Sequence, residues 1–531
     1  MNAAVNGRLK TEDCIRRVRE EATRYLREDI LEHGLTAAER FRRNEAKREF
    51  QFALRNASLG HAGAKKLLCS FIESVLVNAM HLGEADLAAW LPDAGTDVLS
   101  ARDMWDILLY RSMELYGRDA LLRLIGDNHF DRRKSDGSYS IEAEEIRSLF
   151  LREHPTLKFR DRLNILIQRV YEAYKGNGVV DLLLDLRIDG VSGGVSGRVC
   201  LPYEDQGRNG PFDYDSVWIF YHGISVRLSF LSFGSEQELV RICKNIYRYG
   251  NPGQLSEAKG YMVNERMDGS RVAVARPPFC ESWVFFVRKF DSVTCIRTEE
   301  LLTDPGAETA VGLLHYLIAG ERVIGITGEQ GSGKTTLLMS LIGFIPASYN
   351  LRIQELSFEL HLRRQYPERN IVSFRETGNV AGQEGLDFQK KTDGTVNILG
   401  EVATAPVSNW LIQMSLVASA FTLFTHHAKT TQDLVISMRN NLLMEGGFSN
   451  ERIAMEQVVE ALDYDIHMKK APNGHRYIER ITEVKTGNEL LHMGQDGYEL
   501  LHPIRAETAA AMAEKMEDPR EFLRSCYVEQ K

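Results

Sequence analysis

The stretch ERVIGITGEQGSGKTTLLMSLIG, residues 321–343, contains the pattern G-x-x-x-x-G-K-[ST] at Gly328, Gly333, Lys334 and Thr335. The apolar run VIGIT precedes the pattern and the helix-forming run TTLLMSLIGF follows it. Glycines let the backbone wrap around a phosphate chain with its N–H groups turned inward, and the N-terminus of the following helix adds partial positive charge. A strand, a glycine-rich loop and a helix in this order predict that the chain binds a nucleoside triphosphate.

The side chains of this motif predict which groups the ligand meets. Lys334 would neutralise charge on the β- and γ-phosphates, and the hydroxyl of Thr335 would hold Mg²⁺. We therefore expect ATP and Mg²⁺ as cofactors. The predicted nucleotide-binding residues are Gly328, Gly331, Ser332, Gly333, Lys334, Thr335 and Thr336.

Composition limits the class of protein. A chain of 531 residues is long enough for several domains and a sizeable core. The net charge of −9 gives no reason to expect a nucleic-acid partner. Seven scattered cysteines without CxxC spacing indicate reduced thiols in a cytosol. The N-terminal MNAAVNGRLKTEDC lacks the apolar core of a signal peptide, and the best apolar run, LIQMSLVASAFTLF, is too short to span a bilayer. These features predict a cytoplasmic protein.

The chain divides into four predicted regions. Residues 1–178 mix charged and apolar residues at three- and four-residue spacing, which predicts a helical N-terminal extension. Residues 179–300 contain short β-rich runs and one helical run, GSEQELVRICKNIYRYG, and predict a smaller α+β domain; SVWIFYHGISVRLSFLSF reads there as a hairpin around HG. Residues 301–505 alternate strands with helices, typical of an α/β core. Residues 506–531 are alanine-rich and predict a C-terminal helix.

Three further apolar runs in the α/β region end in acidic or polar residues. Ligands bind at the carboxyl ends of parallel strands, so these ends are expected to lie around the γ-phosphate of a RecA-like ATPase core. One glutamate there would polarise the attacking water, a carboxylate would complete the Mg²⁺ shell, and a histidine would sense the γ-phosphate. The runs are LRIQELSFEL with Glu355 and Glu359, TVNILGEV with Gly400 and Glu401, and FTLFTHH with Thr425, His426 and His427.

The neighbouring histidines suggest a metal pair at first sight. Side chains alternate between the two faces of a strand, however, so His426 and His427 point in opposite directions and cannot both bind one ion. One histidine in the core beside an exposed neighbour is the simpler interpretation of the pair.

Together these motifs resemble the secretion ATPases of type II and type IV secretion, type IV pili and tight-adherence pili, and most closely the tight-adherence pilus assembly branch. That family has an acidic box TIEDxxEL, a Walker B strand ending in GE, and a histidine box TxHA. The matching segments here are IQELSFEL, ILGEV and THHA, and the upstream MDGSRVAVARPPF and VFFVRKF resemble the family's DGSR and IRKF strands. The resemblance covers roughly residues 180–500. It implies a RecA-like P-loop ATPase core preceded by a smaller α+β domain and, in this chain, by a helical extension.

The resemblance also implies roles for individual residues. Glu401, Glu355 and His427 match catalytic positions, and Glu401 joins Thr335 around Mg²⁺ through nucleotide and water. Arg271 of DGSR and Arg288 of RKF match arginines that reach the phosphates from the first domain, where a salt bridge is the competing interpretation.

At the level of assembly, the resemblance implies a homo-hexamer that converts hydrolysis into motion of an inner-membrane platform protein. Such a motor works at the cytoplasmic face of the membrane and assembles pili or exports proteins.

The sequence departs from the family pattern at three places. Leu356 stands where the family has the aspartate of its acidic box, and Ala403 replaces the arginine of GEVR. Val417-Ala418-Ser419 occupies the place of a common TGH. Because the matched glutamates are retained, we expect an active but divergent ATPase.

Three other functions remain open at this point. A nucleotide-gated scaffold with little turnover is motivated by Leu356. A DNA-translocating motor would share the core, but the acidic charge balance does not support it. A P-loop kinase of small molecules would not need the THHA strand or the DGSR domain. The role of residues 1–178, the cargo and the direction of the motor are not encoded in recognisable motifs.

Overall fold

The computed structural model describes the chain except at its ends and in several loops. The described residues are 9–28, 36–92, 98–195, 216–250, 252–289, 297–356, 358–376, 380, 382–417, 419–446, 448–471 and 474–529. The chain forms two compact units, Met1–Ser292 and Val293–Lys531. The finer division into four regions stays a prediction.

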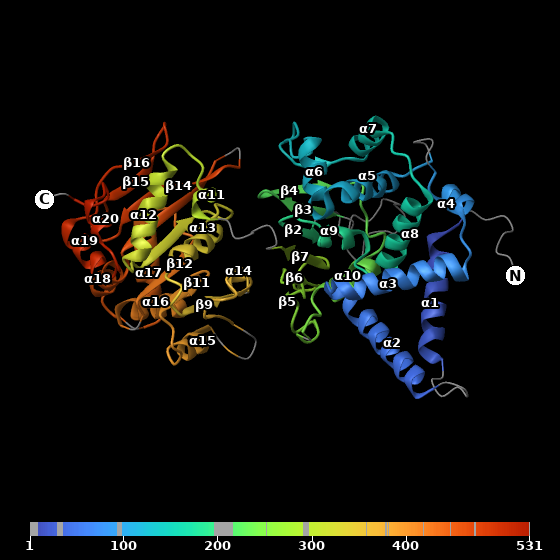
Figure 1. The fold of residues 1–531 in the computed structure, drawn as a ribbon, viewed down its shortest axis with the longest axis horizontal. Coiled ribbons are helices and arrows are strands. Elements are labelled where there is room, and N and C mark those ends of the chain that lie inside the picture. The colour runs from blue at the N-terminus through green and yellow to red at the C-terminus, as the bar shows by residue number, and fades with distance from the viewer. Residues whose placement is uncertain are drawn as a thin grey trace. The chain divides into compact units, whose positions relative to one another are not determined.

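Unit 1 joins a helical part to a sheet (Figure 1). Helices dominate its first 180 residues because apolar residues recur there at helical spacing. Capping boxes start several of them, as at Thr36 and Ser100. The helices are α1 (Thr11–Arg27), α2 (Ala37–Asn56), α3 (Ala62–Ser74), α4 (Glu84–Trp90), α5 (Ala101–Tyr116), α6 (Ala120–Asp127), α7 (Ala143–Glu153), α8 (Phe159–Tyr174), α9 (Asp181–Asp185) and α10 (Glu236–Ile246).

The sheet of unit 1 has the order β1-β4-β3-β2-β7-β6-β5 and is antiparallel except for the β1–β4 pair. The predicted hairpin around HG is present, with His222 and Gly223 both at positive φ between β3 and β4. The predicted helix GSEQELVRICKNIYRYG is α10. The strands are β1 (Ser140–Ile141), β2 (Gly190–Gly193), β3 (Val217–Tyr221), β4 (Ile224–Leu228), β5 (Tyr261–Glu265), β6 (Arg271–Ala275) and β7 (Val284–Arg288).

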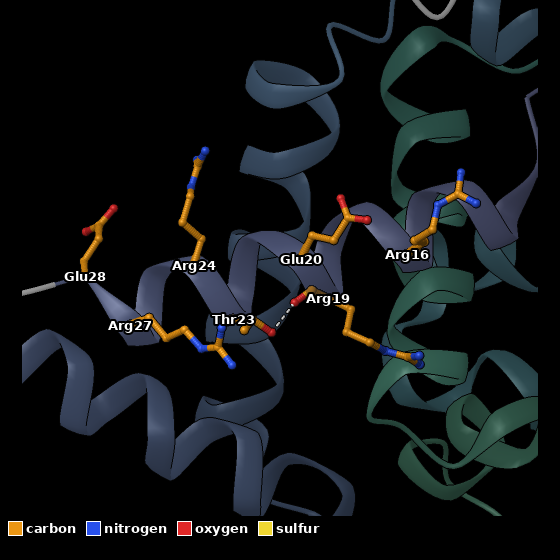
Figure 2. Close-up of a pocket in the computed structure, with 7 residues that line it drawn as sticks. All are labelled: Arg16, Arg19, Glu20, Thr23, Arg24, Arg27 and Glu28. Atoms are coloured by element: carbon orange, nitrogen blue, oxygen red, sulfur yellow. Dashed lines mark hydrogen bonds between the residues drawn. The ribbon is translucent and has the colours of Figure 1, made fainter.

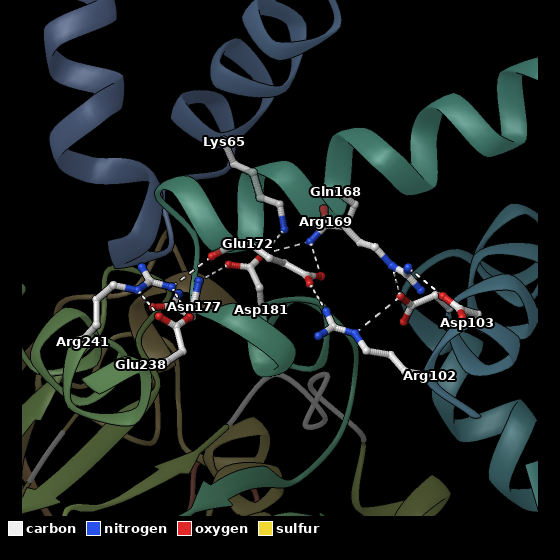
Figure 3. Close-up of polar contacts among 11 residues, drawn as sticks. Lys65, Arg102, Asp103, Gln168, Arg169, Glu172, Asn177, Asp181, Glu238 and Arg241 are labelled. Carbon is white, nitrogen blue, oxygen red and sulfur yellow. Dashed lines mark hydrogen bonds and ion pairs between the residues drawn. The ribbon is translucent and has the colours of Figure 1, made fainter. Parts of the chain in front are cut away.

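Two hydrophobic cores stabilise unit 1. One packs α1–α4 against α8, and the other packs α5–α7, α9 and α10 against the inner face of the sheet. A network of polar side chains joins the helices of the two cores (Figure 3). In it, Arg169 of α8 forms 2.7 Å ion pairs with Asp103 and Asp106 of α5, and Lys65 of α3 contacts Asp181 of α9. These contacts join the core around α1–α4 and α8 to the core beneath the sheet, within one unit.

Unit 2 is built on a nine-stranded sheet of order β10-β9-β11-β12-β8-β13-β14-β15-β16. The first six strands in this order are parallel, and β14–β16 continue the sheet as antiparallel strands. The strands are β8 (Ile324–Gly328), β9 (Leu351–Glu355), β10 (Ile371–Arg375), β11 (Val396–Leu399), β12 (Phe421–His426), β13 (Tyr464–Lys470), β14 (Arg476–Glu483), β15 (Glu489–Met493) and β16 (Tyr498–Leu500).

Helices cover both faces of this sheet (Figure 1). Alternate strand residues divide between two cores, as with Leu423 on the α12–α13 face and Phe424 on the α16–α18 face. The parallel strands are therefore buried on both sides, as in an α/β fold. The helices are α11 (Thr298–Leu301), α12 (Ala307–Ala319), α13 (Lys334–Leu341), α14 (Leu362–Gln365), α15 (Gly382–Gln389), α16 (Ala405–Val417), α17 (Thr431–Met444), α18 (Glu451–Ala461), α19 (Ala506–Ala513) and α20 (Arg520–Arg524).

The predicted fold class is confirmed: a RecA-like α/β core follows an α+β part and a helical extension. The alanine-rich tail contains two short helices, α19 and α20, with Pro519 at the start of the second. No helix among the described residues is both long and apolar enough to cross a membrane.

Candidate nucleotide site

The P-loop runs from the end of β8 to the start of α13. Gly328, Gly331 and Gly333 all have positive φ, at 136°, 78° and 98°. A Cβ on Gly328 would lie 2.2 Å from the carbonyl oxygen of Met468, so no larger residue fits there without moving backbone. Gly333 is the residue before α13, which places the loop at the N-terminus of that helix. The local sequence thus forms a tight glycine loop at the N-terminus of α13.

Lys334 is buried at the base of this loop. Its Nζ donates to the carbonyl oxygens of Gly328 and Glu329 at 2.9 and 2.8 Å. The same Nζ lies 3.2 Å from Nδ1 of His427. The loop therefore holds its cation through its own carbonyl groups, next to the histidine box.

His427 follows the end of β12 and also contacts Glu401, the predicted Walker B glutamate. Its Nε2 lies 3.3 Å from Oε1 of Glu401. Thr425, two residues earlier, donates its hydroxyl to the carbonyl of Gly400, and Val402 N–H donates to the carbonyl of Thr425. These bonds extend the pairing of β11 with β12 beyond the strand ends and bring Glu401 beside His427.

Glu355 ends β9 and is buried beside the same strand ends. Its Oε1 accepts hydrogen bonds from the backbone N–H groups of Glu359 and Leu360, both at 2.8 Å. A Cβ on Gly400 would lie 3.2 Å from Cγ of Glu355. The structure thus brings Glu355 next to the Gly400-Glu401 segment, while Glu359 contributes its backbone to the carboxylate.

The remaining predicted residues lie on the loop and the first turn of α13. Gly331 sits at the tip of the loop, and Ser332 is fully buried with its N–H donating to the carbonyl of Glu329. Thr335 and Thr336 are half-buried in the first turn of α13. Positive φ at three glycines, a buried lysine and a hydroxyl in the first helical turn fit the phosphates of ATP with Mg²⁺.

His426 points to the opposite face of β12, as strand alternation predicts. Its side chain is buried, with Nε2 3.2 Å from Oγ of Ser437 on α17. Burial and the neighbouring positive groups lower the pKa of His426 to about 4. The described residues contain no group of three or more His, Cys, Asp or Glu side chains that could hold a metal ion.

Two of the three sequence departures lie at exposed positions. Leu356 is 47% exposed at the end of β9, and Ala403 is exposed after β11. In the third, Ala418 lies outside the described residues. Leu356 therefore does not fill a core position in place of the missing carboxylate.

Arg271 and Arg288 lie in unit 1, whereas the P-loop lies in unit 2. The two arginines are direct cross-strand partners on β6 and β7. Arg271 also stands opposite Glu265 on β5. The sheet thus brings both predicted arginines to one place, and like charges directly opposite one another are unfavourable without a partner of opposite sign.

Some contacts to the P-loop come from residues that the sequence did not single out. Nε of Arg476, on β14, donates to the carbonyl of Gly331 at 2.8 Å. The hydroxyl of Thr327 donates to buried Asp465 on β13. Neither residue belongs to a recognisable motif, and only the pairing of β8 with β13 and of β13 with β14 places them here.

A surface hollow lies elsewhere, along α1 in unit 1 (Figure 2). Its volume is about 790 Å³, and it is lined by Arg16, Arg19, Glu20, Thr23, Arg24, Arg27 and Glu28. None of these residues belongs to the predicted nucleotide site.

The chain resembles known proteins over part of its length. None of the known protein-family profiles matches the chain. Over 127 residues, 24% of this chain, it is 25% identical to an uncharacterised ABC transporter ATP-binding protein of Haemophilus influenzae. The chain spans about half (53%) of the length of that relative.

Among solved structures, the chain is similar to two ATPases and a pilus retraction motor. The VirB11 ATPase of the Brucella suis type IV secretion system matches with 18% identity and a TM-score of 0.31, over 56% of this chain and 90% of that one. The Legionella pneumophila ATPase DotB matches with 15% identity and a TM-score of 0.36, over 56% and 77%. The pilus retraction motor PilT with bound ADP matches with 15% identity and a TM-score of 0.41, over 64% and 87%.

Proposed function

We propose that this chain is a Mg²⁺-dependent P-loop ATPase of the secretion and pilus motor type. The observation that carries the proposal is the contact chain Lys334–His427–Glu401. It links the P-loop to the Walker B and histidine-box segments, with steps of 3.2 and 3.3 Å. Phosphoryl transfer to water uses a cation for the phosphate oxygens and a carboxylate that can position and deprotonate water. The imidazole of His427 lies between these two groups.

Each residue of the site has its own proposed role. The N–H groups of the P-loop and Lys334 would bind the phosphates. The hydroxyl of Thr335 would hold Mg²⁺ directly, and the carboxylate of Glu401 would hold it through water. Bound Mg²⁺ supplies neutralisation of phosphate charge. Glu401 orients and deprotonates the attacking water, and Glu355 supports this region from β9. His427, in contact with Lys334 and Glu401, senses the terminal phosphate.

Steady-state phosphate release tests this assignment. We expect hydrolysis by the wild type with Mg-ATP, and a loss of at least about 100-fold in Glu401→Gln, because a positioned general base typically contributes 10²–10⁴-fold. Lys334→Ala should lose both binding and hydrolysis. Glu514→Gln, at an exposed position after α19, serves as the matched control and should keep full activity.

Two outcomes would overturn the assignment. If Glu401→Gln kept its hydrolytic activity, Glu401 would not be the general base and the assignment of this site would fail. Tight ATP binding by the wild type, with phosphate release no faster than in Lys334→Ala, would favour the nucleotide-gated scaffold that exposed Leu356 suggests.

The proposed motor is a homo-hexamer in which Arg271 and Arg288 serve the nucleotide of a neighbouring subunit. The sheet face that carries these arginines supports this idea. Strand alternation puts Val263 and Phe286 on the same face, and they are 55% and 43% exposed. An apolar patch that ends in two arginines suits a protein partner with an anionic ligand at its edge.

Subunit mixing tests the role of the arginines in trans. Lys334→Ala and Arg288→Ala chains are each expected to be inactive. Mixed before assembly, they should regain activity, since some interfaces then combine an intact Lys334 with an intact Arg288. If light scattering shows that the two variants co-assemble and the mixture still has no activity, Arg288 does not act at the neighbour's site. A strictly monomeric active enzyme would contradict the ring altogether.

The partner of the motor is proposed to be an inner-membrane platform protein, which places the chain at the cytoplasmic face of the membrane. Hydrolysis should rise when cytoplasmic loops of such a platform are added. No nucleic acid is expected to stimulate it. Stimulation by DNA and not by the platform would favour a translocating motor instead.

A further inference from the structure

The hairpin of β13 and β14 runs beside the P-loop and contacts it at several points. A Cβ on Gly328 would lie 2.2 Å from the carbonyl oxygen of Met468, a residue of β13. Cδ of Arg476 and Cε of Met468 lie 3.2 and 3.4 Å from where a Cβ of Gly333 would be. One hairpin therefore touches the loop near its first and its last motif glycine.

Two polar contacts strengthen this packing. Before the loop, the hydroxyl of Thr327 donates to Oδ1 of Asp465 at 2.6 Å and lies 2.8 Å from Nδ1 of His467. Within the loop, Nε of Arg476 donates to the carbonyl of Gly331 at 2.8 Å. Hydrogen bonds with a charged partner are stronger than neutral ones. The loop is thus held on both sides of Gly328.

Asp465 also reaches the segment that follows His427. Its second oxygen, Oδ2, accepts from the hydroxyl of Thr431, the first residue of α17, at 2.6 Å. Arg480, on β14, donates to the carbonyl of Lys429 at 3.2 Å. The hairpin therefore binds the P-loop on one side and residues 429–431 on the other.

The carboxyl of Asp465 is fully buried, and its two oxygens have hydroxyl donors from two different elements. Burial raises the pKa of Asp465, and the hydrogen bonds from Thr327 and Thr431 oppose that shift. A buried polar group costs stability unless its bonds are made, so this arrangement fixes the positions of both donors.

We propose that Asp465 and Arg476 are positioning residues that hold the P-loop in its phosphate-binding shape before the nucleotide arrives. The inference rests on the nucleotide site proposed above. Because the loop is shaped in advance, each residue should strengthen the binding of nucleoside diphosphates as much as that of triphosphates. Neither residue should change the rate of the chemical step. A residue that sensed the terminal phosphate would instead affect ATP alone.

Arg476→Gln and Asp465→Asn test the proposal with little risk to folding, since Arg476 is exposed and the second change is isosteric. We expect about tenfold weaker binding of ADP and of ATP for each variant, the usual size of a lost hydrogen bond to a charged group. The value of kcat should stay within about twofold, and KM should rise with the dissociation constant. Arg476→Lys, which keeps a cationic donor, should recover part of the affinity.

Hydrogen exchange without nucleotide supplies a second, independent readout. Amides of residues 328–333 should exchange faster in both variants, while those of α18 stay unchanged. The exposed Arg452→Gln change on α18 is the matched control and should alter neither binding nor exchange. The double variant should lose less binding free energy than the two single variants lose together, because both residues hold the same loop.

Several results would overturn the inference. Unchanged affinity for both nucleotides, or unchanged exchange of residues 328–333, would show that the loop does not need the hairpin. A loss confined to ATP, or to kcat, would assign a different role to these residues. If the wild type bound no nucleotide, the proposed function would fail, and the exchange experiment alone would still decide whether the hairpin holds the loop.

Discussion

Replacing Gly328 and Gly331 separately by alanine distinguishes two kinds of constraint in one loop. Both residues have positive φ, so alanine is strained at each. Around Gly331 a new Cβ would meet nothing within 4 Å, whereas at Gly328 it would meet the carbonyl of Met468 at 2.2 Å. Gly331→Ala should therefore be the mild change and Gly328→Ala the severe one.

The magnitudes follow from these contacts. Strain at a positive φ costs about 1 kcal/mol for Gly331→Ala, the low end of the range for unfavourable backbone conformations. That corresponds to roughly fivefold weaker nucleotide binding if the loop relaxes out of its binding shape. Gly328→Ala adds a clash with backbone of β13, which must shift, so we expect a loss above about 3 kcal/mol, more than 100-fold in affinity.

Fluorescence titration with a labelled ADP would measure both affinities, and thermal unfolding would show whether either variant is globally unstable. Gly474→Ala, at a positive-φ glycine outside the loop with nothing within 4 Å, controls for backbone strain alone. Equal losses for Gly328→Ala and Gly331→Ala would refute the reasoning, since Gly328 combines a φ of 136° with the approach of Met468, whereas Gly331 has a φ of 78° and open space around it.

Three further predictions concern stability and pH. Arg169→Met leaves Asp103 and Asp106 without their common partner and should lower the free energy of unfolding of unit 1 by about 3–5 kcal/mol, measured by urea denaturation; an unchanged value would show that the ion pairs contribute nothing net. Phe424→Ala opens a cavity in the core under α16–α18 and should cost about 3–5 kcal/mol in the same assay, with a loss under about 1 kcal/mol contradicting the packing. The pKa of His426 is lowered to about 4, so the unfolded chain binds the extra proton first and stability falls as pH drops from about 6.5 to 4. Denaturation across that range should show a shallower fall in His426→Gln, and an identical slope would mean that His426 is not buried in its neutral form.

Local sequence was sufficient where the determinants lie close together along the chain. The P-loop is recognisable in the sequence because its glycines, lysine and threonine fall within eight consecutive positions, 328–335, and each meets a local requirement of backbone or charge. Hydrophobic runs with polar ends predicted the parallel strands β9, β11 and β12, since their side chains are buried on both faces. The opposite orientations of His426 and His427 followed from the two-residue period of a strand.

Other contacts could not be predicted because they join residues far apart in sequence. Asp465 is 138 residues from Thr327, and Arg476 is 145 residues from Gly331. No spacing rule relates such positions; they meet only after β13 pairs with β8 and β14 pairs with β13. The same holds for the network of Lys65, Asp181 and Arg169, which looks in sequence like ordinary surface charge on helices.

The residues alone predict a phosphate-binding loop between a buried strand and a helix, and they show which strand ends carry acidic and imidazole groups. Only the folded sheet brings Lys334, His427 and Glu401 into one chain of contacts, and it places Asp465 against Thr327 and Arg476 against Gly331. Glycine geometry and strand alternation are local properties of the backbone. The meeting of distant side chains depends on sheet order and register, which are set by burial over the whole unit.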